Sequence, residues 1–481
     1  MPAGGDSATA APGRAEKLPT HKLILFALGQ LGWSLASFGV SNLMPYFYMS
    51  PEKAGAERLF PPFIFEGVFL GVLTIIGVIT FGARAFDAVT NPLIASWSDL
   101  SKSRLGRRRY YMAVSFVPFA VFSVLVFLPL QHFAAMPSAR ASGLNIVWLC
   151  LTILVFYFFY VMYTAPYNAL ISELGHSPKE RLNISTVIGV TWSLGFAVGN
   201  SVYFLKPILQ DAGLSPTAAF QVVQAGFAVL SLLLMALPIL VIDEKRYVDS
   251  TVSEEPLLRS LRSSLRNPNF VRFLFSELLY NVCQTIIQMG LVYYVVTLLQ
   301  LPEDYTSWLI DGMFVASFLF YFPINRLTLR WEKKRMSVVG FVLLAVMFLM
   351  FWFMRKDLPI PGLTFAAITC AVAAIPIAIF TIVPNAIVAD IAEAHGIVTG
   401  DFKAGMFFGV RSFETNVGIS IANVVFPSLL LLGKSVDNPL GIRMSAIVSV
   451  VICLGGMSIM FLYDEKSVLR TLARKETISA P

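Results

Sequence analysis

Charged residues and cysteines are scarce in this chain. Only 14% of its 481 residues are Asp, Glu, Lys or Arg, and 56% are hydrophobic, whereas soluble domains average about 25% charged residues. The composition therefore excludes an ordinary soluble protein and indicates a membrane protein. The four cysteines fall in apolar runs without C-x-x-C spacing, which argues against a disulfide framework or a metal site.

Catalytic signatures are also missing. The polar segments contain no phosphate-binding loop and no nucleophile–base spacing, and they are too short for a catalytic domain. We therefore expect no enzyme activity, no catalytic residue and no cofactor other than Na+ or H+ as a coupling ion. The net charge of +7 does not indicate nucleic acid, because the excess Lys and Arg lie in short loops that set membrane topology. We expect a monomer whose partners are a small-molecule substrate and membrane lipid.

Apolar segments long enough to cross a bilayer, which takes about 20 residues, dominate the chain. They are 23–49, 63–97, 110–132, 144–172, 184–206, 217–242, 269–298, 304–329, 336–354, 363–392, 403–433 and 440–463. The longest charged segment, 243–268, divides these twelve spans six and six. We predict an all-α integral membrane fold with six-helix halves at 23–242 and 269–463. The Ala-, Gly- and Pro-rich stretch 1–22 is expected to be a disordered tail and 464–481 a second tail.

Basic residues concentrate in alternate loops. Lys and Arg cluster at 98–109, 179–181, 245–266, 330–335 and 466–475, whereas 207–216 and 299–307 contain none. Because loops rich in Lys and Arg remain on the cytoplasmic side, both termini are predicted to be cytoplasmic. The expected location is the inner (plasma) membrane of a bacterium.

Three stretches carry a family resemblance. They are RAFDAVTNPL at 84–93 with RLGRRR at 104–109, APYNALISEL at 165–174, and VADIAEAHGIVTGDFKAGMFFG at 388–409. Together they resemble the glycoside–pentoside–hexuronide cation symporters, the melibiose-permease-like branch of the major facilitator superfamily. The resemblance implies a secondary active transporter that works by alternating access. It also implies a sugar or similar polar organic solute as substrate and coupling to Na+ or H+.

The chain departs from this family at several functional positions. The family's paired carboxylates on the second helix fall on Asp87 and Asn91, so only one charge remains, and its lysine on the eleventh helix falls on Asn416. Its charged sugar-binding residues fall on uncharged positions, namely Ser34, Thr164 and Gly189. Other branches carry lysolipids, and this chain has 40 phenylalanines. An amphiphile or lysolipid transporter, and a non-transporting sensor or scaffold, therefore stay open as alternatives.

The second predicted span holds the candidate cation-coupling site. Arg84, Asp87 and Asn91 occur at i, i+3 and i+7, which places them on one helical face, and Thr90 is included in this group. A charge at the centre of a membrane helix costs about 2.5–3.5 kcal/mol, so such residues usually serve a function. We interpret the group as a cation or proton site tuned by Arg84; a structural ion pair is the alternative.

Amides and hydroxyls supply the candidate substrate site. Asn281, Gln284 and Gln288 lie on one face of the seventh predicted span, and Asn281 lies about 16 Å from its start at 1.5 Å per residue. Their donors and acceptors suit solute hydroxyls, although hydrogen bonds between helices are an equally good interpretation. The other candidates in this group are Gln30, Trp33, Ser34, Thr164 and Asn168.

Charged residues at the span ends form a candidate gating group. Asp99 with Arg107, Arg108 and Arg109 is predicted to act as a latch between helices on the cytoplasmic side. The remaining members flank the loop between the tenth and eleventh spans, namely Asp390, Glu393, Arg411 and Glu414. The i, i+3 spacing of the last two predicts that they pair with each other. Alternatively, Arg411 replaces the missing lysine near Asn416.

Overall fold

The computed structural model describes residues 17–52, 58–70, 73–101, 103–130, 139–175, 178–247, 265–328, 330–357, 359–399 and 404–479. Within them, twelve helices have 19 or more residues. They are α1 (Thr20–Asn42), α3 (Ile75–Leu100), α4 (Arg107–Leu125), α5 (Ala139–Leu174), α6 (Pro178–Asn200), α8 (Pro216–Val241), α11 (Pro268–Tyr293), α12 (Asp304–Thr328), α13 (Lys333–Phe353), α14 (Gly362–Thr399), α15 (Ala404–Leu430) and α16 (Leu440–Leu462). The predicted all-α membrane fold is confirmed.

Short elements connect or extend the long helices. They are α2 (Met44–Tyr48), the antiparallel strands β1 (Val68–Leu70) and β2 (Leu73–Thr74), α7 (Val202–Asp211), α9 (Glu244–Tyr247), the π-helical turn η1 (Tyr294–Leu298) and α17 (Glu465–Ser479). In the described part of the chain, ten helices are long and apolar enough to span a membrane. The other two long helices, α3 and α4, carry charges that lower their hydropathy.

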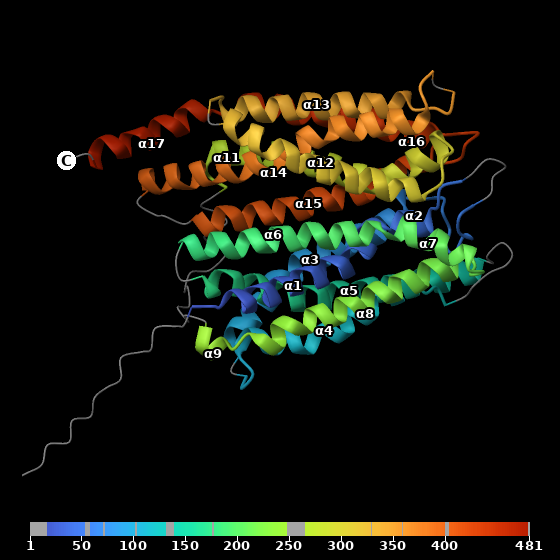
Figure 1. Cartoon of the computed structure of the whole chain (residues 1–481), viewed down its shortest axis with the longest axis horizontal. Coiled ribbons are helices and arrows are strands. Elements are labelled where there is room, and N and C mark those ends of the chain that lie inside the picture. The colour runs from blue at the N-terminus through green and yellow to red at the C-terminus, as the bar shows by residue number, and fades with distance from the viewer. Residues whose placement is uncertain are drawn as a thin grey trace, which may run out of the picture.

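The long helices form two halves that lie side by side (Figure 1). In the N-terminal half, α1 packs against α6 and α8, and α4 packs against α5; in the C-terminal half, α11 packs against α15 and α16. The halves meet where α3 packs against α15 and where α12 packs against α6 and α7. The chain therefore buries its central helices, α1 and α11, within the two halves.

The two ends of the bundle differ in character. One end, here named the basic end, carries residues 103–106, α9, residues 330–335 and α17. The opposite end, named the sheet end, carries α2, the strands β1 and β2, and the loop 431–439 (Figure 1). In Figure 1 the basic end lies to the left and the sheet end to the right. The C-terminal segment is more than a tail, because α17 is helical and packs against α14.

Three predicted spans are wrong in their boundaries, and one of them, 184–206, breaks at Ser201 between α6 and α7. Residues 63–70 and 73–74 are not the start of a helix: they include the strands β1 and β2, and α3 begins only at Ile75. The hydroxyl of Thr74 caps α3 by accepting from the backbone N–H of Gly77. The first span also breaks at Leu43, before α2. Pro45 lies in the first turn of α2, where a missing N–H is tolerated, but it would interrupt a continuous helix.

Candidate functional site

Arg84 and Asp87 form a buried ion pair on α3. Their side chains are 6% and 4% exposed, and Nη1 of Arg84 lies 3.6 Å from Oδ2 of Asp87. Charge-assisted hydrogen bonds are about 2.7–2.9 Å long, so this pair is loose. Oδ1 of Asp87 and Nε of Arg84 are both buried without a hydrogen-bond partner. The aspartate therefore keeps one oxygen that can accept a proton or a cation.

The surroundings of the pair tie α3 to the neighbouring helices. Nη2 of Arg84 donates to the Ser41 hydroxyl on α1 at 2.8 Å, and the guanidinium lies 4.9 Å from the centre of the Tyr157 ring on α5. The Thr90 hydroxyl donates to backbone carbonyls of its own helix, and Asn91 is half-buried. Arg84 therefore also has a structural function, and Thr90 directs its hydroxyl proton to α3 itself.

The amides of α11 form the accessible face of an otherwise buried helix. From Asn281 to Leu299 every residue is buried except Asn281, Gln284 and Gln288, which are half-buried. Their spacing places them on one side of the helix. This polar stripe therefore faces away from the packed core of the C-terminal half. The Tyr280 hydroxyl approaches Oε1 of Gln284 at 3.4 Å.

The other predicted substrate residues occupy different environments. Gln30, Trp33 and Ser34 are 2%, 9% and 0% exposed within the N-terminal half. Trp33 packs edge-on against the Tyr160 ring at 5.9 Å, and Ser34 donates to the Leu31 carbonyl. Thr164 is buried and Asn168 is exposed, both on α5. Within the described residues, none of these five forms a hydrogen bond with the α11 amides, and their functions stay predictions.

A second buried charge cluster joins α11 to α15. The guanidinium of Arg411 forms a bidentate pair with Glu277: Nη2 lies 2.6 Å from Oε1 and Nε lies 2.9 Å from Oε2. Its Nη1 donates to Oδ1 of Asn385 on α14 at 2.6 Å. The predicted pairing of Arg411 with Glu414 is therefore wrong. A planar guanidinium binds best to a carboxylate that can form two parallel hydrogen bonds with it. Tertiary packing places Glu277 of α11 in that position.

Glu414 is held differently from Arg411. Its Oε1 accepts from Nδ2 of Asn281 at 3.3 Å, whereas its buried Oε2 has no hydrogen-bond partner. Sequence reasoning missed Glu277, although an isolated acid inside the apolar run 269–298 is a signal of the same kind as Asp87. Asn281 therefore connects the amide face of α11 to this charge cluster.

At the basic end, arginines of the predicted latch bind carboxylates of the N-terminal half. Arg107 and Arg108 lie 2.9 and 3.0 Å from Oε1 of Glu173 at the end of α5. The backbone N–H groups of Arg108 and Arg109 donate to the carboxylate of Glu244, which sits at the N-terminus of α4. A negative charge at this position is favourable because helix N-termini carry partial positive charge.

The C-terminal half repeats this arrangement. Asp390 at the basic end of α14 forms an ion pair with Lys333. The carboxylate of Glu465 accepts from the backbone N–H groups of Lys333 and Lys334, both at 2.9 Å, at the N-terminus of α13. Each half thus uses one acid to cap a helix and another to bind its first basic residue, as expected of a duplicated unit. The side chain of Asp99 and the whole of Lys102 lie outside the described part of the chain.

At the sheet end, a buried lysine links the two halves. Nζ of Lys206 on α7 lies 2.6 Å from Oε1 of Glu303, just before α12, and 2.9 Å from the hydroxyl of Tyr46. The Tyr46 hydroxyl in turn donates to Oε2 of Glu303. The lysine side chain is 0% exposed and the glutamate 7% exposed. Sequence reasoning missed both, although a lysine inside an apolar run was a signal.

Further contacts between the halves accompany this triad. Lys434, in the loop before α16, forms an ion pair with Glu66 at 2.5 Å, and the Tyr293 hydroxyl on α11 donates to the Met49 carbonyl at 2.9 Å. Burial lowers the pKa of Lys434 from its ordinary value of 10.5, and Glu66 opposes this shift. Asn200 donates to Asp311 on α12 at 3.2 Å. Together these bonds hold the sheet end closed.

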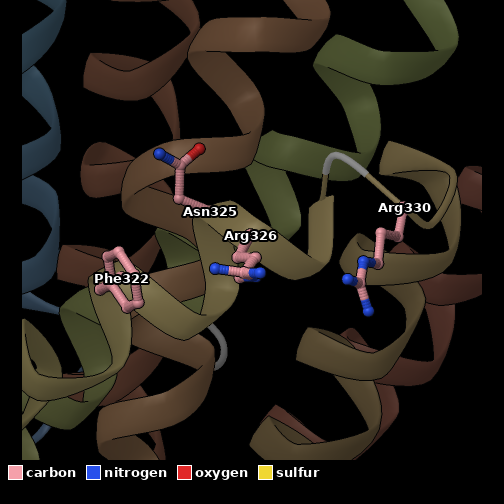
Figure 2. A pocket seen from close by; sticks show the side chains of 4 residues that line it. All are labelled: Phe322, Asn325, Arg326 and Arg330. Atoms are coloured by element: carbon pink, nitrogen blue, oxygen red, sulfur yellow. The ribbon is translucent and has the colours of Figure 1, made fainter.

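A hollow at the basic end carries positive charge. It is lined by residues of α12 and the turn after it, namely Phe322, Asn325, Arg326 and Arg330 (Figure 2). All four side chains are exposed. None belongs to the predicted coupling or substrate groups. A second, wholly apolar hollow lies between α7 and α8.

Two packed halves of membrane helices, with isolated charges buried inside them, define a multi-pass integral membrane transporter of the major facilitator type. Comparison with known proteins agrees: the family described as MFS/sugar transport protein matches residues 25–467. The chain belongs to this family, so it is a secondary active transporter and not an enzyme. The resemblance to the cation symporters seen in its motifs is confirmed.

Individual relatives are distant and match the chain over different lengths. The isoprimeverose transporter of Lactiplantibacillus pentosus is 23% identical over 380 residues, which cover 78% of this chain and 76% of the relative. The putative glycoside/cation symporter YagG of Escherichia coli (strain K12) is 30% identical over 107 residues, 22% of each chain. The crystal structure of the nucleoside transporter NupG is similar with a TM-score of 0.63 and 17% identity, covering 92% of this chain and 99% of that one. At this identity the structural likeness supports the fold alone.

Proposed function

We propose that this protein is a cation-coupled symporter for a sugar or a similar polar organic solute. The main observation in support is the polar stripe of Asn281, Gln284 and Gln288, which is the accessible face of the otherwise buried helix α11. Amide groups both donate and accept hydrogen bonds, as solute hydroxyls do. The names of the relatives, an isoprimeverose transporter and a glycoside/cation symporter, support the same substrate class.

The conformation suggests which side the site opens to. Lys206, Glu303 and Tyr46 close the sheet end, so we take the basic end as the side from which the site is reached. The clustering of arginines at the basic end supports a cytoplasmic location for it. The protein then stands in its inward-facing conformation, in the inner membrane of a bacterium, and acts as a monomer with both termini in the cytoplasm.

Asp87 is the proposed coupling residue of the N-terminal half. Its contact with Arg84 is loose, and its Oδ1 has no partner, so a proton or Na+ can bind there without first breaking a strong pair. One carboxylate attracts Na+ less than two do, and Arg84 offsets part of that charge. We therefore expect weak Na+ stimulation and a larger dependence on pH.

Alternating access follows from these parts. Binding of the ion neutralises Asp87 and frees Arg84 from its attraction, and binding of the solute at the α11 stripe brings the halves together around it. Closure at the basic end requires the bonds at the sheet end to break, because the halves rock about a site near the midplane. Release of the ion restores the Arg84–Asp87 attraction and resets the carrier.

The test is uptake and counterflow of isoprimeverose and related glycosides in proteoliposomes, with Na+ and pH varied separately. Counterflow above that of protein-free vesicles supports transport. Absence of counterflow for every glycoside tried, together with uptake of a lysolipid, would replace the substrate class.

Asn91→Asp should strengthen Na+ stimulation by adding a second carboxylate. Asp87→Asn should abolish the ion dependence of this site; normal stability with unchanged ion dependence would remove Asp87 from the mechanism. Cysteines at Ser103 and Asp437, which lie at opposite ends, should label from opposite sides.

A further inference from the structure

A six-residue pattern occurs on both helices that face each other across the interface. Residues 82–87 are GARAFD and residues 409–414 are GVRSFE, so both stretches follow the pattern Gly-x-Arg-x-Phe-acid. The first lies on α3 and the second on α15, and these helices pack together between the halves. Each half therefore places an arginine and an acid at i, i+3 beside the interface.

Arg84 and Arg411 pair with acids in different positions relative to their own motifs. On α3, Arg84 lies 3.6 Å from the acid of its own motif, Asp87. On α15, Arg411 binds Glu277 of α11 in a bidentate pair and leaves Glu414 without a guanidinium partner. With both glutamates ionised, this cluster would carry one negative charge more than Arg411 neutralises.

Glu414 is buried and accepts one hydrogen bond. It is 6% exposed, its Oε1 accepts from Nδ2 of Asn281, and its buried Oε2 has no partner. The same Nδ2 of Asn281 also donates to the Thr415 hydroxyl at 3.4 Å, and the next residue, Asn416, is uncharged. On the neighbouring helix α3, Arg84 and Asp87 pair with each other. On α14, the side-chain oxygen of Asn385 accepts from Arg411.

An uncompensated carboxylate inside a membrane protein is costly unless it binds a positive ion. Hard metal cations need several oxygen ligands, whereas the groups in contact with Glu414 are an amide N–H and, one turn away, a guanidinium already bound elsewhere. A proton needs only one oxygen, and Oε2 is unpartnered. Ionised Glu414 would compete with Glu277 for Arg411, because Glu414 follows Arg411 at i+3 on α15, on the same side of the helix.

We propose that Glu414 is a proton-binding site in the C-terminal half, separate from Asp87. A proton from water binds Oε2 while Arg411 is held by Glu277, and it returns to water when Arg411 moves toward Glu414. The exchange thus loosens or tightens the link between α11 and α15. Asn281 carries this change to the amide stripe of α11. The relevance of the Glu414 site to transport rests on the proposed symport function, whereas the existence of the site does not.

Infrared difference spectra of the purified full-length protein, recorded between acidic and alkaline buffers, test the site without substrate. The parent should show the carbonyl stretch of a buried carboxylic acid, and Glu414→Gln should lose that band. The matched control Glu332→Gln removes a partly exposed acid paired with Arg335 and should keep it. A band that persists in Glu414→Gln, or that disappears only in Asp87→Asn, overturns the proposal.

A conservative variant and a transport assay complete the test. Glu414→Asp keeps the acid and should keep the band at a shifted frequency, so an unshifted band in that variant also overturns the proposal. In proteoliposomes, accumulation of isoprimeverose driven by a pH gradient should be lower in Glu414→Gln than in the parent, because one of two proton-binding acids is removed. Full pH-driven accumulation in this variant would contradict a coupled proton at Glu414. Absence of all uptake in the parent would instead refute the proposed function and leave the infrared result standing.

Discussion

Removing one charge from the sheet-end triad should shift the protein between its two main conformations. Glu303→Gln replaces the carboxylate that pairs with the ammonium of Lys206, 0% exposed in the closed sheet end, by a neutral amide. Removing one partner of a buried ion pair costs about 3–5 kcal/mol. Opening the sheet end relieves this cost, because the lysine then regains water.

The remaining contacts of Lys206 set the magnitude. Its Nζ keeps the Tyr46 hydroxyl at 2.9 Å and the Phe60 ring at 4.6 Å, and a cation–π contact contributes about 0.5–2 kcal/mol. We therefore take the lower end, about 3 kcal/mol. At about 1.4 kcal/mol per tenfold change, this shifts the ratio of closed to open by roughly 150-fold. A closed sheet end favoured about a hundredfold would fall to about equal populations.

Distances between spin labels at Ser215 and Asp437, exposed residues of the two halves at the sheet end, measure this ratio directly. Glu303→Gln should add a population at longer distance. The double variant Lys206→Met, Glu303→Met should largely restore the closed distribution, because apolar residues of similar volume can replace a buried pair at little cost. An unchanged distribution in Glu303→Gln, or a double variant as open as the single one, would refute the reasoning.

Three further predictions address other parts of the molecule. Gln284→Ala should weaken solute binding by about 2- to 10-fold, the value of one neutral hydrogen bond, while the matched control Thr285→Val, buried on the packed side of α11, should not; equal effects in direct binding assays would return the amides to packing. Glu244→Gln should lower the unfolding temperature by weakening the cap on α4, a loss of about 1 kcal/mol, with binding unchanged; a purely functional defect would contradict this assignment. Burial lowers the pKa of Lys434 in the closed sheet end, so between that pKa and 10.5 the closed form binds fewer protons than the open one, and raising the pH should favour closure. Lys434→Met should remove this pH dependence from the label distances, and a dependence that survives would assign it to another group.

The sequence by itself determined the helices and their grouping. Hydrophobic length is a local property, so eleven of the twelve predicted spans have counterparts that start within about six residues of their predicted positions. Arg84 and Asp87 were also found from sequence, since a charge within an apolar run needs no tertiary information to be noticed. The exception, 63–74, directly follows Pro61 and Pro62 and contains Gly67, residues that disfavour a continuous helix.

Only the tertiary structure decided which charges meet. Spacing along α15 predicted that Arg411 pairs with Glu414, but the guanidinium binds Glu277, which is 134 residues away. Lys206 and Glu303 are 97 residues apart and belong to different halves. An ion pair inside a membrane protein forms wherever packing brings a carboxylate to the guanidinium or ammonium with good geometry, and that depends on which helices lie side by side. The accessible stripe of α11 was likewise visible as a pattern, but only packing established which side of the helix remains uncovered.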